Sequence, residues 1–154
     1  MNERFQAQME AITAAVAGKP LNDELQAWLN EQYGPDSEWF RATETLCRQG
    51  VAEGWLCQHE AGGLRYGRVI KPGPATAGFS VDVVDMEDIR GPHHSHPNGE
   101  IDLVMPQSGD ARFDLTPAGW KVYPPGTAHY PTVRDGRALV LYLLPEGSIQ
   151  FTKT

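Results

Sequence analysis

The stretch GPHHSHPNGEID (Gly91–Asp102) contains three of the chain's five histidines and two carboxylates. In an extended strand, alternate side chains lie on the same face. His94 and His96 are therefore expected to point the same way, and His93 to point the other way. This alternation predicts a β-strand that presents a pair of imidazoles to one ligand.

A carboxylate follows the histidine pair across a tight turn. The turn PNG reverses the chain, so that the next strand begins with Glu100, and Asp102 shares the face of Glu100. Two imidazoles and a carboxylate in this order can converge on one cation. Asp102, Glu100 and His93 are also the candidate catalytic residues, since a positioned carboxyl or imidazole can move protons. Asp102 could instead orient a ligand histidine or be solvated.

A second stretch, YPPGTAHYPTV (Tyr123–Val133), supplies a further ligand. Its Pro/Gly turn is followed by His129, which is expected to open a strand next to the first site. The predicted metal ligands are His94, His96, Glu100 and His129. Three histidines and one glutamate leave one or two coordination positions open, as in a catalytic metal site. Fe, Mn, Zn, Ni and Co all accept this set, so we expect one divalent metal ion of undetermined identity.

The rest of the chain predicts an α+β protein that is mainly β. Apolar residues recur at helical spacing in the first third, and Gly18–Pro20 and Gly34–Pro35 interrupt the pattern. From about residue 55, short β-branched or aromatic runs alternate with turns. These runs are LRYGRVI, FSVDVV, IDLVM, ARFDL, WKVYP, HYPTV and ALVLYLL. We expect a single domain, 1–154, in which a helical segment (1–54) packs on a jelly-roll-like antiparallel β-barrel (55–154).

Composition excludes several classes of protein. The chain has 154 residues and a net charge of −7, with no basic run that would bind nucleic acid. No stretch approaches the roughly 20 apolar residues of a membrane span, and the N-terminus is too polar for a secretory signal. Cys47 and Cys57 lack the spacing of a metal or disulfide motif, so we expect reduced thiols and a cytoplasmic location.

The two histidine stretches resemble the paired motifs of the cupin superfamily. Gly91–Glu100 is similar to the first motif, in which a glycine is followed by HxH, a short gap and glutamate. Gly119–His129 is similar to the second motif, PxG followed three residues later by histidine. The departures are the position of Gly91 close to the first ligand, the late Gly109, and Val133 in place of the usual asparagine. The resemblance covers about residues 60–150 and implies a cupin fold, whose barrel edges commonly pair, so a homodimer is expected.

Three longer segments resemble the small 4-hydroxylaminobenzoate lyase family of bacterial nitroaromatic degradation. They are HSHPNGEIDLVMP, GWKVYPPGTAHYPTV and ALVLYLLPEGSIQF. The resemblance implies conversion of 4-hydroxylaminobenzoate, a small aromatic carboxylate, to protocatechuate with release of ammonia, without nicotinamide or flavin. Alternatives are an Fe(II)- and O₂-dependent cupin dioxygenase on an aromatic or thiol substrate, a metal-dependent sugar isomerase or epimerase, and a small-molecule sensor.

The sequence offers several candidate residues for binding such a substrate and does not select among them. A benzoate favours one inward arginine, because a guanidinium pairs a carboxylate with two parallel hydrogen bonds. Arg65 and Arg68 have opposite parity on one predicted strand, so at most one of them points inward. Further candidates are Arg112 and Arg134 for the carboxylate, and Tyr66, Tyr123, Tyr130 and Tyr142 for the pocket walls.

Overall fold

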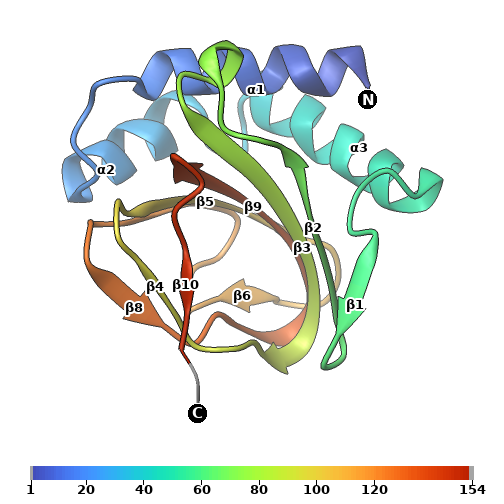
Figure 1. Cartoon of the computed structure of the whole chain (residues 1–154). Helices are drawn as coiled ribbons and strands as arrows, with labels where there is room; N and C mark the ends of the chain where they lie inside the picture. The colour runs from blue at the N-terminus through green and yellow to red at the C-terminus, as the bar shows by residue number, and fades with distance from the viewer. Residues whose placement is uncertain (1, 153–154) are drawn as a thin grey trace.

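A computed structural model describes residues 2–152 of the chain. The first third forms three helices, α1 (Glu3–Val16), α2 (Asp23–Gln32) and α3 (Glu38–Glu53). Each helix begins after a residue whose side chain accepts a hydrogen bond from a free backbone N–H of the first turn: Asn2, Asn22 and Ser37. The helices predicted from apolar spacing are confirmed, and Figure 1 shows them gathered on one side of the strands.

The N-cap of α3 is a testable source of stability. Replacing Ser37 with alanine should lower the free energy of unfolding by about 1 kcal/mol, because the amide of Phe40 loses the hydroxyl that it contacts at 3.2 Å. Urea denaturation measures this difference. Thr45→Ala, at an exposed position of the same helix, is the matched control and should change stability by less than about 0.5 kcal/mol. A Ser37→Ala midpoint equal to that of the wild type would contradict the assignment.

The remainder of the chain forms antiparallel strands in two sheets. The larger sheet has the order β1-β2-β3-β9-β5-β7, with β6 paired to β9, and the smaller sheet has the order β10-β4-β8 (Figure 1). The strands are β1 (His59–Ala61), β2 (Leu64–Ile70), β3 (Phe79–Arg90), β4 (His94–His96), β5 (Glu100–Pro106), β6 (Arg112–Phe113), β7 (Gly119–Tyr123), β8 (Thr127–His129), β9 (Thr132–Pro145) and β10 (Gln150–Phe151), and a short 3₁₀ helix, η1 (Pro74–Thr76), precedes β3.

Strand β5, between β9 and β7, is buried on both faces. Ile101 and Leu103 pack with the apolar side chains of the helices in one core cluster. Because successive side chains alternate, Glu100 and Asp102 lie on the opposite face, which is the face turned toward β4 of the smaller sheet. The helices thus cover one face of the large sheet and leave the other for the site.

The predicted mainly β, cupin-type fold is confirmed, with three differences in detail. Within residues 2–152 the strands form two sheets and not a closed barrel. The run ARFDL was expected to be a strand, but only Arg112–Phe113 is extended, because Asp114 turns the chain with a φ of +48°. His129 closes β8 instead of opening a strand, since Pro131 has no N–H to continue the ladder.

Two further expectations concern the thiols and the membrane. Cys47 and Cys57 are both free and buried, as predicted. Burial raises the pKa of the Cys57 thiol to about 12, so it stays protonated and unreactive. Among the described residues, no helix is both long and apolar enough to cross a membrane.

Candidate metal centre

The turn between β4 and β5 brings the first three candidate ligands together. His94 and His96 are buried on one face of β4, and the chain reverses at Gly99, whose amide donates to the carbonyl of His96. Gly99 has a φ of +86°, and a Cβ at this position would lie 2.7 Å from the carbonyl oxygen of Tyr123. Only glycine fits this turn without strain, and it places Glu100 at the start of β5.

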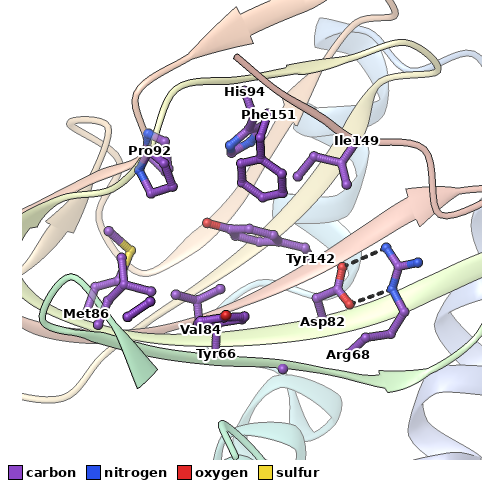
Figure 2. Close-up of a pocket in the computed structure, with 14 residues that line it drawn as sticks. Tyr66, Arg68, Asp82, Val84, Met86, Pro92, His94, Tyr142, Ile149 and Phe151 are labelled. Carbon is purple, nitrogen blue, oxygen red and sulfur yellow. Dashed lines mark hydrogen bonds and ion pairs between the residues drawn. The ribbon is translucent and has the colours of Figure 1, made fainter. Parts of the chain in front are cut away.

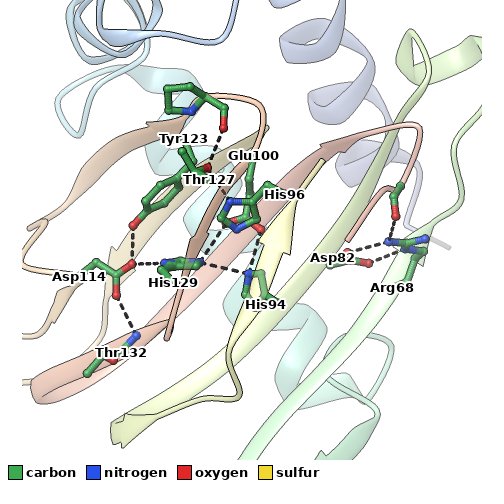
Figure 3. Close-up of polar contacts among 12 residues, drawn as sticks. Arg68, Asp82, His94, His96, Glu100, Asp114, Tyr123, Thr127, His129 and Thr132 are labelled. Carbon is green, nitrogen blue, oxygen red and sulfur yellow. Dashed lines mark hydrogen bonds and ion pairs between the residues drawn. The ribbon is translucent and has the colours of Figure 1, made fainter. Parts of the chain in front are cut away.

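The fourth candidate ligand arrives from the neighbouring strand of the small sheet. β8 pairs with β4 so that His129 lies directly opposite His94. One ligand atom each from His94, His96, Glu100 and His129 lies within 4.8 Å of the others. Figure 3 shows the three imidazoles gathered around the Glu100 carboxylate. The structure thus brings together all four residues that the spacing singled out.

The distances between these atoms suit one metal ion. Nε2 of His94 and Nε2 of His129 are 3.1 Å apart, and Nε2 of His96 lies 3.3 Å from the Glu100 carboxylate. The longer contacts of Glu100, to His94 and His129, are 3.7 and 3.8 Å. Ligand atoms about 2.1 Å from one ion lie roughly 3.0–3.4 Å apart at octahedral or tetrahedral angles. The four ligand atoms lie within 4.8 Å of one another, so some of them have to move closer together to bind one ion.

Hydrogen bonds fix the tautomers of two of the histidines. Nδ1 of His129 lies 2.5 Å from the Asp114 carboxylate, which can only accept, so this nitrogen carries the proton. Nδ1 of His96 lies 3.0 Å from the Thr127 hydroxyl, which already donates to the carbonyl of Pro124 and therefore accepts from His96. In both rings Nε2 then carries a lone pair; that of His96 faces Glu100, and that of His129 faces His94 and, at 3.8 Å, Glu100.

The cluster is therefore a set of hydrogen-bond acceptors that face one another. Both carboxylate oxygens of Glu100 and Nε2 of His96 are buried without a hydrogen-bond partner among the described residues. Such groups are costly to bury unless a proton or a metal ion lies between them. The residues fit a divalent metal, with imidazole and carboxylate donors that suit Fe, Mn, Zn, Ni or Co.

Asp114 was not among the residues singled out from the sequence. It lies in the turn after β6, and its carboxylate also accepts from the hydroxyl of Tyr123 and, at 2.9 Å, from the amide of Thr132. The Asp114 carboxylate thus has three contacts, with Tyr123, Thr132 and His129, and the contact with His129 orients that imidazole (Figure 3). The sequence shows Asp114 only as an aspartate in the run ARFDL. Its contact with His129 depends on the pairing of β6 with β9, which the sequence does not show.

Glu100 and Asp102 have opposite protonation tendencies. Burial raises the pKa of Glu100, but the neighbouring imidazoles of His94 and His96 outweigh this effect and hold the pKa at about 2. Burial, followed by the negative charge of Glu100, raises the pKa of Asp102 well above its usual range. A proton shared by this pair therefore resides preferentially on Asp102.

His93 lies apart from this cluster. Its ring packs on Tyr130 at 4.7 Å between centroids, and its Nδ1 lies 2.8 Å from the Thr152 hydroxyl. The predicted outward orientation of His93 fits this position. Its contacts bind the end of the chain to β4, so we do not assign His93 a role in proton transfer.

A cavity of about 430 Å³ adjoins the cluster through His94. Figure 2 shows the ring of Tyr142 in its middle, with the Arg68–Asp82 pair on one side and Met86 on the other. The walls are mostly apolar and aromatic, as in pockets for small organic ligands. The residues that line it are Ala61, Leu64, Tyr66, Gly67, Arg68, Asp82, Val84, Met86, Pro92, His94, Pro131, Tyr142, Ile149 and Phe151.

Only some of the candidate substrate-binding residues line the cavity. Tyr66 and Tyr142 line it, whereas Tyr123 contacts Asp114 and Tyr130 packs on His93 outside it. Of the four candidate arginines, Arg68 alone lines the cavity; Arg65, Arg112 and Arg134 are exposed elsewhere.

Two antiparallel sheets that hold an HxH pair, a glutamate and a distant histidine between them define a cupin. Within this class, the chain belongs to the 4-hydroxylaminobenzoate lyase family: the family model PnbB, 4-hydroxylaminobenzoate lyase, matches residues 7–151. The 4-hydroxylaminobenzoate lyase of Pseudomonas putida is 37% identical over 90% of this chain and 88% of its own. That of Nocardioides sp. (strain LMS-CY) is 35% identical over 88% of this chain and 86% of its own. The chain is thus a lyase.

Solved structures with a similar fold are more distant. An RmlC-like cupin protein from Ralstonia eutropha JMP134 is 15% identical, with a TM-score of 0.45 over 60% of this chain and 62% of its own. An oxalate oxidase in complex with the substrate analogue glycolate is 21% identical, with a TM-score of 0.45 over 60% of this chain and 57% of its own.

Proposed function

We propose that the protein converts 4-hydroxylaminobenzoate to protocatechuate and ammonia, at a metal ion held by His94, His96, Glu100 and His129. The observation that carries this proposal is the position of His94, which belongs both to the acceptor cluster and to the wall of an aromatic cavity. A planar aromatic substrate can therefore reach the cluster from the cavity. The names of the family and of its relatives supply the substrate.

The proposed reaction needs no external oxidant or reductant. The N–O bond of the hydroxylamino group breaks and its oxygen leaves as water. One water oxygen adds to the neighbouring ring carbon, and a second replaces the nitrogen as the C–N bond breaks and ammonia leaves, with a net uptake of one water. Nitrogen gains two electrons and the ring loses two, so the electrons balance without nicotinamide or flavin. A bound divalent metal would supply Lewis acidity toward the departing oxygen and would lower the pKa of a water molecule.

The chain's own groups have separable roles in this proposal. Tyr142 lines the cavity, and its hydroxyl has no hydrogen-bond partner among residues 2–152 (Figure 2). Burial raises the pKa of Tyr142, so the hydroxyl stays neutral and can donate a hydrogen bond to the hydroxylamino end of the substrate. Asp102 does not line the cavity, and we assign it a positioning role as the neutral carboxyl beside Glu100.

Anaerobic turnover tests the proposal. Purified protein of known metal content is incubated with 4-hydroxylaminobenzoate without oxygen, and ammonia and protocatechuate are measured together. We expect both products in equal amounts, with about one metal ion per chain. A requirement for oxygen would favour a cupin dioxygenase instead, and failure to form either product would refute the lyase proposal. The homodimer and the cytoplasmic location stay predictions, to be checked by light scattering and by cell fractionation.

A further inference from the structure

Among the described residues that line the cavity, one side chain, that of Arg68, is always positively charged. Arg68, on β2, lies in the wall with its side chain about one-third exposed, beside Asp82 on β3. In both close-ups the Arg68–Asp82 pair lies apart from His94 (Figures 2 and 3). The cavity therefore has two polar ends, one at His94 and one at Arg68.

The guanidinium of Arg68 is oriented but not saturated. Nε and Nη2 donate to the two carboxylate oxygens of Asp82 at 2.8 and 3.2 Å, and Nη2 also donates to the carbonyl of Gly147 at 3.1 Å. These contacts use three of the five N–H donors of a guanidinium. Both N–H groups of Nη1 lack an acceptor within residues 2–152. Asp82 and Gly147 thus fix the plane of a donor group that still has capacity for another carboxylate.

We propose that Arg68 binds the ring carboxylate of the substrate and makes the protein selective for carboxylated arylhydroxylamines. This inference rests on the proposed lyase function. In 4-hydroxylaminobenzoate the carboxylate and the hydroxylamino group are at opposite ends of a rigid ring. A carboxylate bound by Arg68 would lie at the end of the cavity away from His94, and the rigid ring would extend past Tyr142 toward His94. Charge-assisted hydrogen bonds of this kind give orientation as well as affinity.

The neighbouring carboxylate does not prevent this binding. Asp82 occupies the edge of the guanidinium formed by Nε and Nη2, which leaves Nη1 for a second carboxylate. The pair without substrate is neutral, so the apolar cavity does not hold an uncompensated charge before the substrate enters. Asp82 acts here as a positioning residue for Arg68.

The test compares 4-hydroxylaminobenzoate with N-phenylhydroxylamine, which lacks the carboxylate. The double variant Arg68→Met/Asp82→Asn replaces the ion pair with neutral groups and so avoids an unpaired buried carboxylate. We expect the ratio of kcat/KM for the two compounds to fall by roughly 10- to 100-fold. Arg68→Lys, which keeps the charge but loses the planar group, should give an intermediate ratio. Arg65→Met, on the same strand but outside the cavity, should leave the ratio at its wild-type value.

Benzoate binding separates the failure of this inference from the failure of the lyase proposal. By calorimetry, benzoate should bind the double variant at least about tenfold more weakly than the wild type or Arg65→Met. If the wild type lacks turnover but its benzoate binding depends on Arg68, the lyase proposal falls and the carboxylate site stands. If the wild type turns over and the ratio is unchanged in the double variant, Arg68 is not the carboxylate site. Equal benzoate binding by both folded proteins would likewise overturn the inference.

Discussion

The Glu100→Gln variant should contain less than about a tenth of the metal of the wild type and convert 4-hydroxylaminobenzoate roughly a thousandfold more slowly. Glutamine keeps the shape of Glu100 but removes the only negative charge among the four candidate ligands. Three neutral imidazoles then face an amide that binds a divalent ion weakly. A metal ion that stabilises the transition state by several kcal/mol accounts for a rate loss of this size when it is removed. Elemental analysis and the paired assay of ammonia and protocatechuate measure both effects.

Loss of folding would not explain this result. The neighbouring histidines lower the pKa of Glu100, so its charge stabilises the metal-free protein at neutral pH. The metal-free variant should therefore melt somewhat below the metal-free wild type but stay folded, which circular dichroism checks. Glu60→Gln, at an exposed position of β1, is the matched control and should keep both metal and turnover. Wild-type turnover by a metal-free Glu100→Gln protein would refute the metal-dependent mechanism, and His96→Ala should behave as Glu100→Gln does.

The sequence predicts the part of the centre that depends on local geometry. The alternation of a strand places His94 and His96 on one face, and a turn that only Gly99 can make puts Glu100 next to them. These relations span seven residues and need no tertiary information. His129 was predictable because its Pro/Gly turn resembles the second cupin motif, which accompanies the first motif in that superfamily.

Residues that act through tertiary pairing could not be found in this way. Asp114 contacts His129 only because β6 pairs with β9 and the chain turns with a positive φ. Arg68 was distinguishable from Arg65 by parity, but parity alone does not say which of the two faces the cavity. The position of β2 beside β3, with Asp82 next to Arg68, decides it. Contacts between distant strands therefore identify the supporting residues, whereas spacing identifies the ligands.

Replacing Asp114 with asparagine should weaken metal binding by roughly 10- to 100-fold while the four candidate ligands stay in place. The asparagine oxygen can still accept from the amide of Thr132, as Oδ1 of Asp114 does. Its NH₂ group then replaces the oxygen that faces Nδ1 of His129 and the hydroxyl of Tyr123. Two donors would meet there unless His129 moves its proton to Nε2. In that tautomer, Nε2 carries hydrogen where the metal needs a lone pair.

Metal titration distinguishes this tautomer effect from a general loss of activity. Because Asp114→Asn changes affinity and leaves His129 present, excess metal should restore most of the turnover, whereas it should not restore Glu100→Gln. Tyr123→Phe removes one donor to Asp114 but keeps the contact between Asp114 and His129. The metal affinity of this variant should therefore fall by less than that of Asp114→Asn. Asp110→Asn, at an exposed position in the preceding turn, controls for the loss of a negative charge. If Asp114→Asn binds metal as tightly as Asp110→Asn, the orientation of His129 does not depend on the Asp114 carboxylate.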